Sequence, residues 1–168
     1  CFTRTALRRA TATKANLIHI ASHFVLRPGD EAASYLLLGD GDRLSLRDFR
    51  DLDIKLSGVD LLTLSACETG VGQARLGSGA EVEGFGVLAQ NQGARAVVAT
   101  LWPALDFGAA TFMQDFYRLL ASKRGVERAR ILQEAQLRAI GRDREGATQA
   151  QFARPYFWAG FILIGSIS

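Results

Sequence analysis

The sequence predicts an α/β fold in which a mostly parallel sheet is flanked by helices. Three short runs are almost wholly apolar: Leu17–Ala21, Val59–Ser65 and Ala96–Leu101. Strands of this kind are buried on both faces, as in parallel sheets. Segments with helical spacing lie between and after these runs, and strands that alternate with helices typically form a parallel sheet.

The composition suits one globular domain. The chain has 168 residues, of which 48% are hydrophobic and 22% charged, and this balance is that of a folded domain rather than a disordered chain. No apolar run approaches the roughly 18 residues of a membrane span, so no membrane partner is expected. Cys1 and Cys67 are too few for a disulfide framework, which favours reduced thiols and a cytoplasmic location.

The charge distribution raises the question of nucleic acid. The net charge is +3, and basic residues gather in residues 1–14 and 118–144, as nucleic-acid-binding surfaces can. Aromatic residues are not interleaved with them, however, as base stacking requires. Glu134 lies four residues from both Arg130 and Arg138, an ordinary pairing on a solvated helix. A nucleic-acid-binding domain is therefore the weakest hypothesis, and no direct nucleic-acid partner is expected.

The first half of the chain contains further predicted elements. Residues 4–13 can form a short helix. Ser34–Gly41 predicts a strand that ends in a turn, because its two glycines break regular structure. Ser45 with Asp48 resembles a capping box that opens a short helix to about Leu52.

The second half contains three predicted helices and a final strand: Ala80–Gln92, Phe107–Ala121, Val126–Ile140 and Phe161–Ile164. Gly93 can end the first helix. Pro103 breaks the chain before the second. The expected buried face of the second helix consists of residues at helical spacing: Ala110, Met113, Tyr117 and Leu120.

Residues with catalytic chemistry follow the three apolar strands. His23 comes two residues after the first, Cys67 two residues after the second, and Asp106 five residues beyond the third. If the strands are parallel, their carboxyl ends share one edge, which is where open α/β sheets place function. A thiol with a pKa of roughly 8.5 is mostly protonated at neutral pH, and an imidazole can take its proton. The pattern predicts a cysteine nucleophile with a histidine base.

Each of these residues also has an ordinary explanation. A cysteine after an apolar strand is often buried and inert, and His19 is more simply a hydrogen-bonded core histidine. His19 and His23 have no carboxylate or thiol beside them, so no metal site is expected. Asp106 can be only the N-cap of a helix that begins at Phe107. Gly70–Gly79 lacks a Gly-Lys-Ser/Thr ending, which favours a mobile loop over a phosphate-binding loop.

Six segments together resemble one known family: "LIHIASHF", "SYLLLGDG", "LSACETG", "GFGVLAQNQGARAVVATLWP", "FMQDFY" and "PYFWAGFILIG". They resemble the CHAT domain, a caspase-like (clan CD) cysteine peptidase module commonly linked to tetratricopeptide repeats. A histidine upstream of the cysteine, at a separation close to the roughly 50 residues of caspases, agrees with this. The resemblance implies a caspase-hemoglobinase-like fold over residues 1–168.

The resemblance also implies roles for particular residues. By position, His23 matches the catalytic histidine and Cys67 the nucleophile, and the backbone N–H groups of Phe24 and Cys67 match the oxyanion donors. Many members have glycine where this chain has Phe24; the N–H is kept, but the conformational freedom of glycine is not. Trp102 and Asp106 match substrate-binding positions, with Asp106 expected to select a basic P1 residue.

The expected function is therefore that of a cysteine endopeptidase that acts on a protein or peptide substrate without a metal or organic cofactor. The alternative is a non-catalytic CHAT-like protein-interaction module. Residues 1–16 are too short to supply the first strand and helix of a whole caspase-like fold, and the chain begins with Cys1. We therefore expect an N-terminally truncated domain that is regulated by an upstream repeat or sensor region of the same polypeptide.

Overall fold

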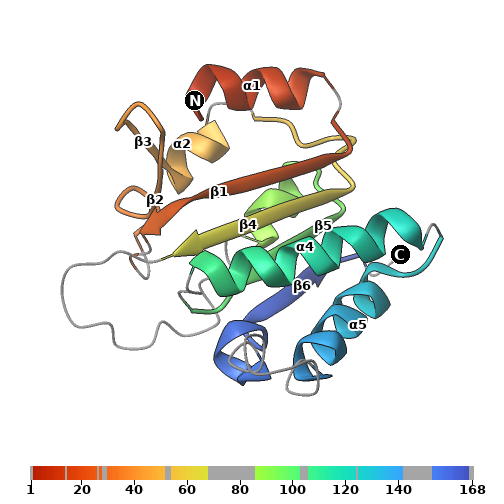
Figure 1. The fold of residues 1–168 in the computed structure, drawn as a ribbon. Coiled ribbons are helices and arrows are strands. Elements are labelled where there is room, and N and C mark those ends of the chain that lie inside the picture. Colours follow the sequence, from red (N-terminus) through yellow and green to blue (C-terminus); the bar gives the residue numbers. More distant parts are fainter. Residues whose placement is uncertain are drawn as a thin grey trace.

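The chain folds around a single sheet with helices on both faces (Figure 1). The computed structural model describes nine stretches of the chain: residues 2–13, 15–25, 27, 30–51, 54–67, 86–102, 106–123, 125–141 and 153–166. The side chains of residues 65–67 and 106–107 lie outside this description.

The described residues form six strands: β1 Leu17–Val25, β2 Tyr35–Leu37, β3 Arg43–Ser45, β4 Leu61–Cys67, β5 Ala96–Thr100 and β6 Phe161–Gly165. The helices with complete bounds are α1 Arg4–Ala12, α2 Leu46–Asp51, α4 Asp106–Ser122, α5 Arg128–Gly141 and the 3-10 helix η3 Pro155–Phe157. Residues 86–91 are also helical.

The sheet is mixed, which corrects the prediction of a mostly parallel sheet. Its strand order is β3-β2-β1-β4-β5-β6. The central strands β1, β4 and β5 are parallel, whereas β2, β3 and β6 join by antiparallel pairs. A parallel neighbour requires a crossover of a dozen or more residues, and the connections from β1 to β2 and from β2 to β3 are too short for one. After β5 the chain runs back along α4, forward along α5 and back again along β6, so it reverses three times and β6 is antiparallel to β5 (Figure 1).

Each face of the sheet has its own hydrophobic core. On one face the buried side chains of the sheet pack against α1, α2 and residues 86–91, with Leu7, Phe49 and Ala89 as the contributions of these helical segments. On the other face α4 and α5 cover the sheet (Figure 1) and pack on side chains of β4, β5 and β6. The strand alternation divides the sheet residues between the two cores.

The buried face of α4 differs from the predicted one. Its buried side chains are Ala109, Phe112, Met113, Phe116 and Leu119. Of the predicted set, Met113 is buried, Tyr117 and Leu120 are partly buried against the same core, and Ala110 is exposed. The pattern lay one position off the true face because nearly every turn of this helix carries adjacent apolar residues.

The capping box predicted at α2 is confirmed. The backbone N–H of Asp48 donates to Ser45 Oγ at 2.9 Å, and the N–H of Ser45 donates to Asp48 Oδ2 at 3.2 Å. The helix ends at Asp51, close to the predicted Leu52. Before it, a turn at Gly41, whose φ of 87° favours glycine, joins β2 to β3.

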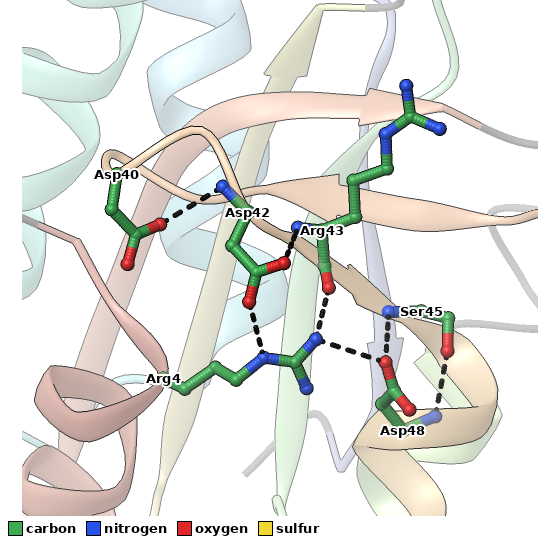
Figure 2. Close-up of polar contacts among 6 residues, drawn as sticks. All are labelled: Arg4, Asp40, Asp42, Arg43, Ser45 and Asp48. Atoms are coloured by element: carbon green, nitrogen blue, oxygen red, sulfur yellow. Dashed lines mark hydrogen bonds and ion pairs between the residues drawn. The ribbon is translucent and has the colours of Figure 1, made fainter.

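One arginine joins α1 to this region (Figure 2). The Arg4 guanidinium donates to Asp42 Oδ2 at 2.9 Å, to Asp48 Oδ2 at 3.2 Å and to the carbonyl oxygen of Arg43. We call these four residues the Arg4 cluster. The hydrogen bond from Arg4 lowers the pKa of Asp42. Burial alone would raise the pKa of Asp48, but its hydrogen bonds from Ser45 and Arg4 lower it. Both carboxylates are therefore held ionised, and they tie α1 to β3 and α2.

Candidate active site

The two predicted catalytic residues occupy opposite positions on neighbouring parallel strands. His23 of β1 is the register partner of Cys67, which is the last residue of β4. Neighbouring strands lie about 4.8 Å apart, so these two backbone positions adjoin. We call this pair the His23–Cys67 rung. The His23 side chain is exposed, and the Cys67 thiol lies outside the described atoms.

Both residues belong to strands rather than to the turns beyond them, which corrects the sequence interpretation. β1 was expected to end at Ala21 but continues to Val25, because β2 pairs with its last residues: Phe24 lies opposite Leu36 and Val25 opposite Tyr35. β1 is also not buried on both faces, since exposed and buried residues alternate along its first half. The pairing with β2 supports β1 immediately after His23.

The predicted oxyanion donor Phe24 belongs to this paired end of β1. Its ring packs against the core on the α2 side of the sheet. One residue earlier than His23, Ser22 Oγ donates to the carbonyl oxygen of Leu37 in β2. The backbone around His23 is thus fastened on the β2 side as well as on the β4 side.

Trp102 lies just beyond the carboxyl end of β5, which ends at Thr100. In the β4–β5 ladder the pair nearest this end is Leu64 with Ala99. The indole Nε1–H donates to the carbonyl oxygen of Tyr156 at 2.9 Å, and the ring packs closely on Gly160. The segment around η3 therefore fixes the indole at this edge of the sheet.

Asp106 is the first residue of α4, one residue earlier than the predicted helix start. Its backbone therefore belongs to the first turn of the helix, and its carboxylate lies outside the described atoms. The predicted loop Gly70–Gly79 and the break at Pro103 also lie outside the described residues. The described structure makes His23 and Cys67 register partners, and α4 begins four residues after Trp102 in the sequence.

The family comparison identifies the kind of domain. The family model described as the CHAT domain matches residues 1–166. The chain belongs to the CHAT domain family. This family is caspase-like and related to peptidases, in agreement with the mixed α/β sheet flanked by helices. No curated protein matches the chain with significant similarity.

A hydrogen-bonded group that sequence reasoning missed lies on the CHAT domain's α4 side. Tyr117 Oη lies 3.0 Å from Thr63 Oγ1 and 3.0 Å from His19 Nδ1. Burial lowers the pKa of His19. Burial also raises the pKa of Tyr117, and the hydrogen bond to Thr63 opposes that rise. The prediction that His19 is hydrogen-bonded is confirmed, but the imidazole keeps an exposed edge. We call these three residues the Tyr117 lock.

The described stretches of the CHAT domain hold neither a cluster of metal ligands nor a helix that could span a membrane. Across the described stretches, no three side chains of the histidine, cysteine, aspartate and glutamate types come together as metal ligands would. None of the helices in those stretches is long and apolar enough to cross a membrane. His19 itself is engaged with Tyr117 through Nδ1.

Proposed function

We propose that this CHAT domain is a cysteine endopeptidase in which His23 and Cys67 form the catalytic dyad. The observation that carries the proposal is the rung itself: the two residues are register partners on adjacent parallel strands. Paired positions on neighbouring strands belong to the same face of a sheet. Cys67 is also the last residue of β4, so the pair lies at the carboxyl end of that strand, where open α/β sheets bind their ligands.

The proposed chemistry needs only a thiol, an imidazole and backbone N–H groups. His23 takes the proton of Cys67, and the thiolate attacks the scissile carbonyl carbon. The oxyanion that forms accepts hydrogen bonds from the N–H groups assigned here to Phe24 and Cys67. The C–N bond then breaks, and the imidazolium gives its proton to the leaving amine. Water, deprotonated by His23, cleaves the thioester and restores the thiol.

The proposed substrate is a peptide with arginine or lysine before the scissile bond. Asp106 begins the helix that follows β5, close in sequence to the fixed indole of Trp102. A carboxylate in a partly dry cleft pairs strongly with a guanidinium, which it can hold by two parallel hydrogen bonds. We assign to Asp106 the recognition of that cation and to Trp102 one wall of the same subsite.

Hydrolysis of fluorogenic arginyl peptides tests the proposal. Cys67→Ala should reduce turnover to background, and His23→Ala should reduce kcat by about 10²–10⁴-fold, the usual contribution of general acid–base catalysis. Cys1→Ser serves as the matched thiol control and should keep the parental rate. Near-parental hydrolysis by Cys67→Ala or His23→Ala would contradict the dyad. A folded chain that hydrolyses no peptide would favour the alternative, a non-catalytic protein-interaction module.

A second substitution tests the basic-residue preference. Asp106→Asn keeps the size of the side chain but removes its charge. The preference for arginine over its neutral analogue citrulline at P1 should fall about tenfold to a hundredfold, the range of a hydrogen bond to a charged group. Thermal stability should change little. An unchanged P1 preference would reduce Asp106 to a helix-terminal residue.

A further inference from the structure

Two residues of the Tyr117 lock, His19 and Thr63, are paired on the same two strands as the proposed dyad, four residues earlier. His19 of β1 is the register partner of Thr63 of β4, just as His23 is the partner of Cys67 four residues later. Four residues of strand span about 13 Å. An even spacing also keeps the positions on one face of the sheet, which is the face that α4 covers.

The lock is built around a buried polar atom. Thr63 is one of two polar residues found buried in the described part of the chain, with none of its surface exposed. A buried hydroxyl without a partner is unfavourable. The O–H of Tyr117 donates to Thr63 Oγ1, and the same oxygen is hydrogen-bonded to His19 Nδ1, with the donor set by the imidazole tautomer. One side chain of α4 thereby contacts two strands through directional bonds.

Directional bonds constrain α4 differently from its other contacts. The remaining core of this helix on the sheet is apolar, with Phe112, Met113 and Phe116 among the buried side chains. Apolar contact is non-directional, so alone it permits a helix to shift along the sheet. The two hydrogen bonds of Tyr117 fix where the helix lies along the direction of the strands.

The position of Tyr117 also determines the level of the helix start. α4 runs back along the sheet, and it begins on the side of the molecule toward which the β1 and β4 arrows point (Figure 1). From Tyr117 back to Asp106 the helix axis spans about 16 Å. This length is close to the roughly 13 Å between the His19–Thr63 pair and the His23–Cys67 rung. A helix held at Thr63 by Tyr117 therefore begins at about the level of the His23–Cys67 rung.

We propose that Tyr117 is a positioning residue, which through Thr63 and His19 fixes the start of α4, and with it Asp106, beside the His23–Cys67 rung. Its consequence for peptide cleavage rests on the proposed peptidase function. The effect of Tyr117 on the position of the helix start does not depend on that function, and it can be measured in a chain without activity. Tyr117→Phe removes one oxygen atom and keeps the ring. Tyr35→Phe, at a half-buried position on β2, is the matched control.

Hydrogen exchange in the full chain tests the hold directly. In Tyr117→Phe the amides of residues 108–112 should exchange about fivefold faster, the change expected for one net hydrogen bond. The amides of α5 and the whole of Tyr35→Phe should keep the parental rates. Unchanged exchange at residues 108–112 would overturn the proposal, whether or not the chain cleaves peptides.

Peptide kinetics then test the positioning role. Tyr117→Phe should raise KM for arginyl peptides and lower the preference for arginine over citrulline about fivefold. The double variant with Asp106→Asn should lose no more preference than Asp106→Asn alone, since both changes act on one contact. Additive losses, or an unchanged preference in an active Tyr117→Phe, would overturn the inference. Absence of hydrolysis in the parental chain would instead overturn the proposed function, and exchange alone would then decide the hold on α4.

Discussion

Replacing Gly160 by alanine should displace the indole of Trp102 and weaken the binding of arginyl peptides. A Cβ at position 160 would lie 2.8 Å from Trp102 Cε2 and 3.1 Å from its Cδ2 and Cζ2. The indole cannot retreat freely, because its Nε1–H donates to the carbonyl oxygen of Tyr156 at 2.9 Å. Either the ring moves and this hydrogen bond is lost, or the backbone at Gly160 shifts.

The size of the effect follows from these two terms. Overpacking by one methyl group destabilises by about 1–3 kcal/mol, and loss of one hydrogen bond adds about 1 kcal/mol. We expect Gly160→Ala to reduce the free energy of unfolding by about 2–4 kcal/mol, measured by urea denaturation. Gly141→Ala is the matched control, because a Cβ there meets no atom within 4 Å. Its stability should equal or slightly exceed the parental value, since alanine is the better helix former.

The same variant tests the substrate role of Trp102. If the indole forms a wall of the P1 subsite, its displacement should raise KM more than it lowers kcat, because the dyad lies on the neighbouring strands β1 and β4. Parental stability together with parental KM would refute the reasoning, since the contact with the indole would then carry neither packing nor binding. A loss of stability without a change in KM would leave Trp102 as a structural residue only.

Three further perturbations test the fold around the site. The pKa values of Asp42 and Asp48 are lowered from 3.8 in the folded chain, so these two carboxylates stabilise the fold at pH values above 3.8. This stabilisation is lost as the pH falls through the lowered pKa values. Arg4→Ala should therefore shift acid unfolding, followed by circular dichroism, to higher pH. The lowered pKa of His19 favours the neutral imidazole, so stability should fall as the pH drops below the ordinary value of 6.5; His19→Gln should flatten this dependence in urea titrations at pH 5 to 8. Gly93→Ala should destabilise strongly in thermal unfolding, because φ is 106° and the added Cβ lies 2.8 Å from a backbone nitrogen; a parental melting temperature would contradict this.

The sequence predicted that His23 and Cys67 share one edge of the sheet, because the signal there is local. Apolar runs that stop at polar residues identify strand ends, and β1, β4 and β5 are indeed parallel neighbours. Their order along the sheet then makes His23 and Cys67 neighbours. The exact strand ends were wrong, because β1 is extended by pairing with β2, a contact that no local pattern of β1 contains.

The mixed character of the sheet was not predicted for a similar reason. β2 and β3 have three residues each, too few to show a period, and only β2 was expected. The direction of β3 relative to β2 is decided by the short turn at Gly41, whose glycines the sequence did indicate. The direction of β6 depends on two helices in succession, which an alternation of strands with single helices does not describe.

The side-chain groups that fasten the site could not be predicted from spacing. The Tyr117 lock joins residues from β1, β4 and α4, and the Arg4 cluster joins α1 to β3 and α2. Such contacts depend on how whole elements pack against one another, so no local sequence motif indicates them. Capping at α2 could be predicted, because Ser45 and Asp48 are three residues apart and interact locally.

The central claim is that Cys67 is a nucleophile activated by His23, and the labelling rate of its thiol measures this most directly. An arginyl electrophile that reacts with thiols should add once to the chain, and peptide mapping should place the adduct on Cys67 and not on Cys1. His23→Ala should slow the reaction by about a hundredfold or more, because the thiol loses its base. Equal labelling of Cys1 and Cys67, or a rate at Cys67 that does not depend on His23, would contradict the account.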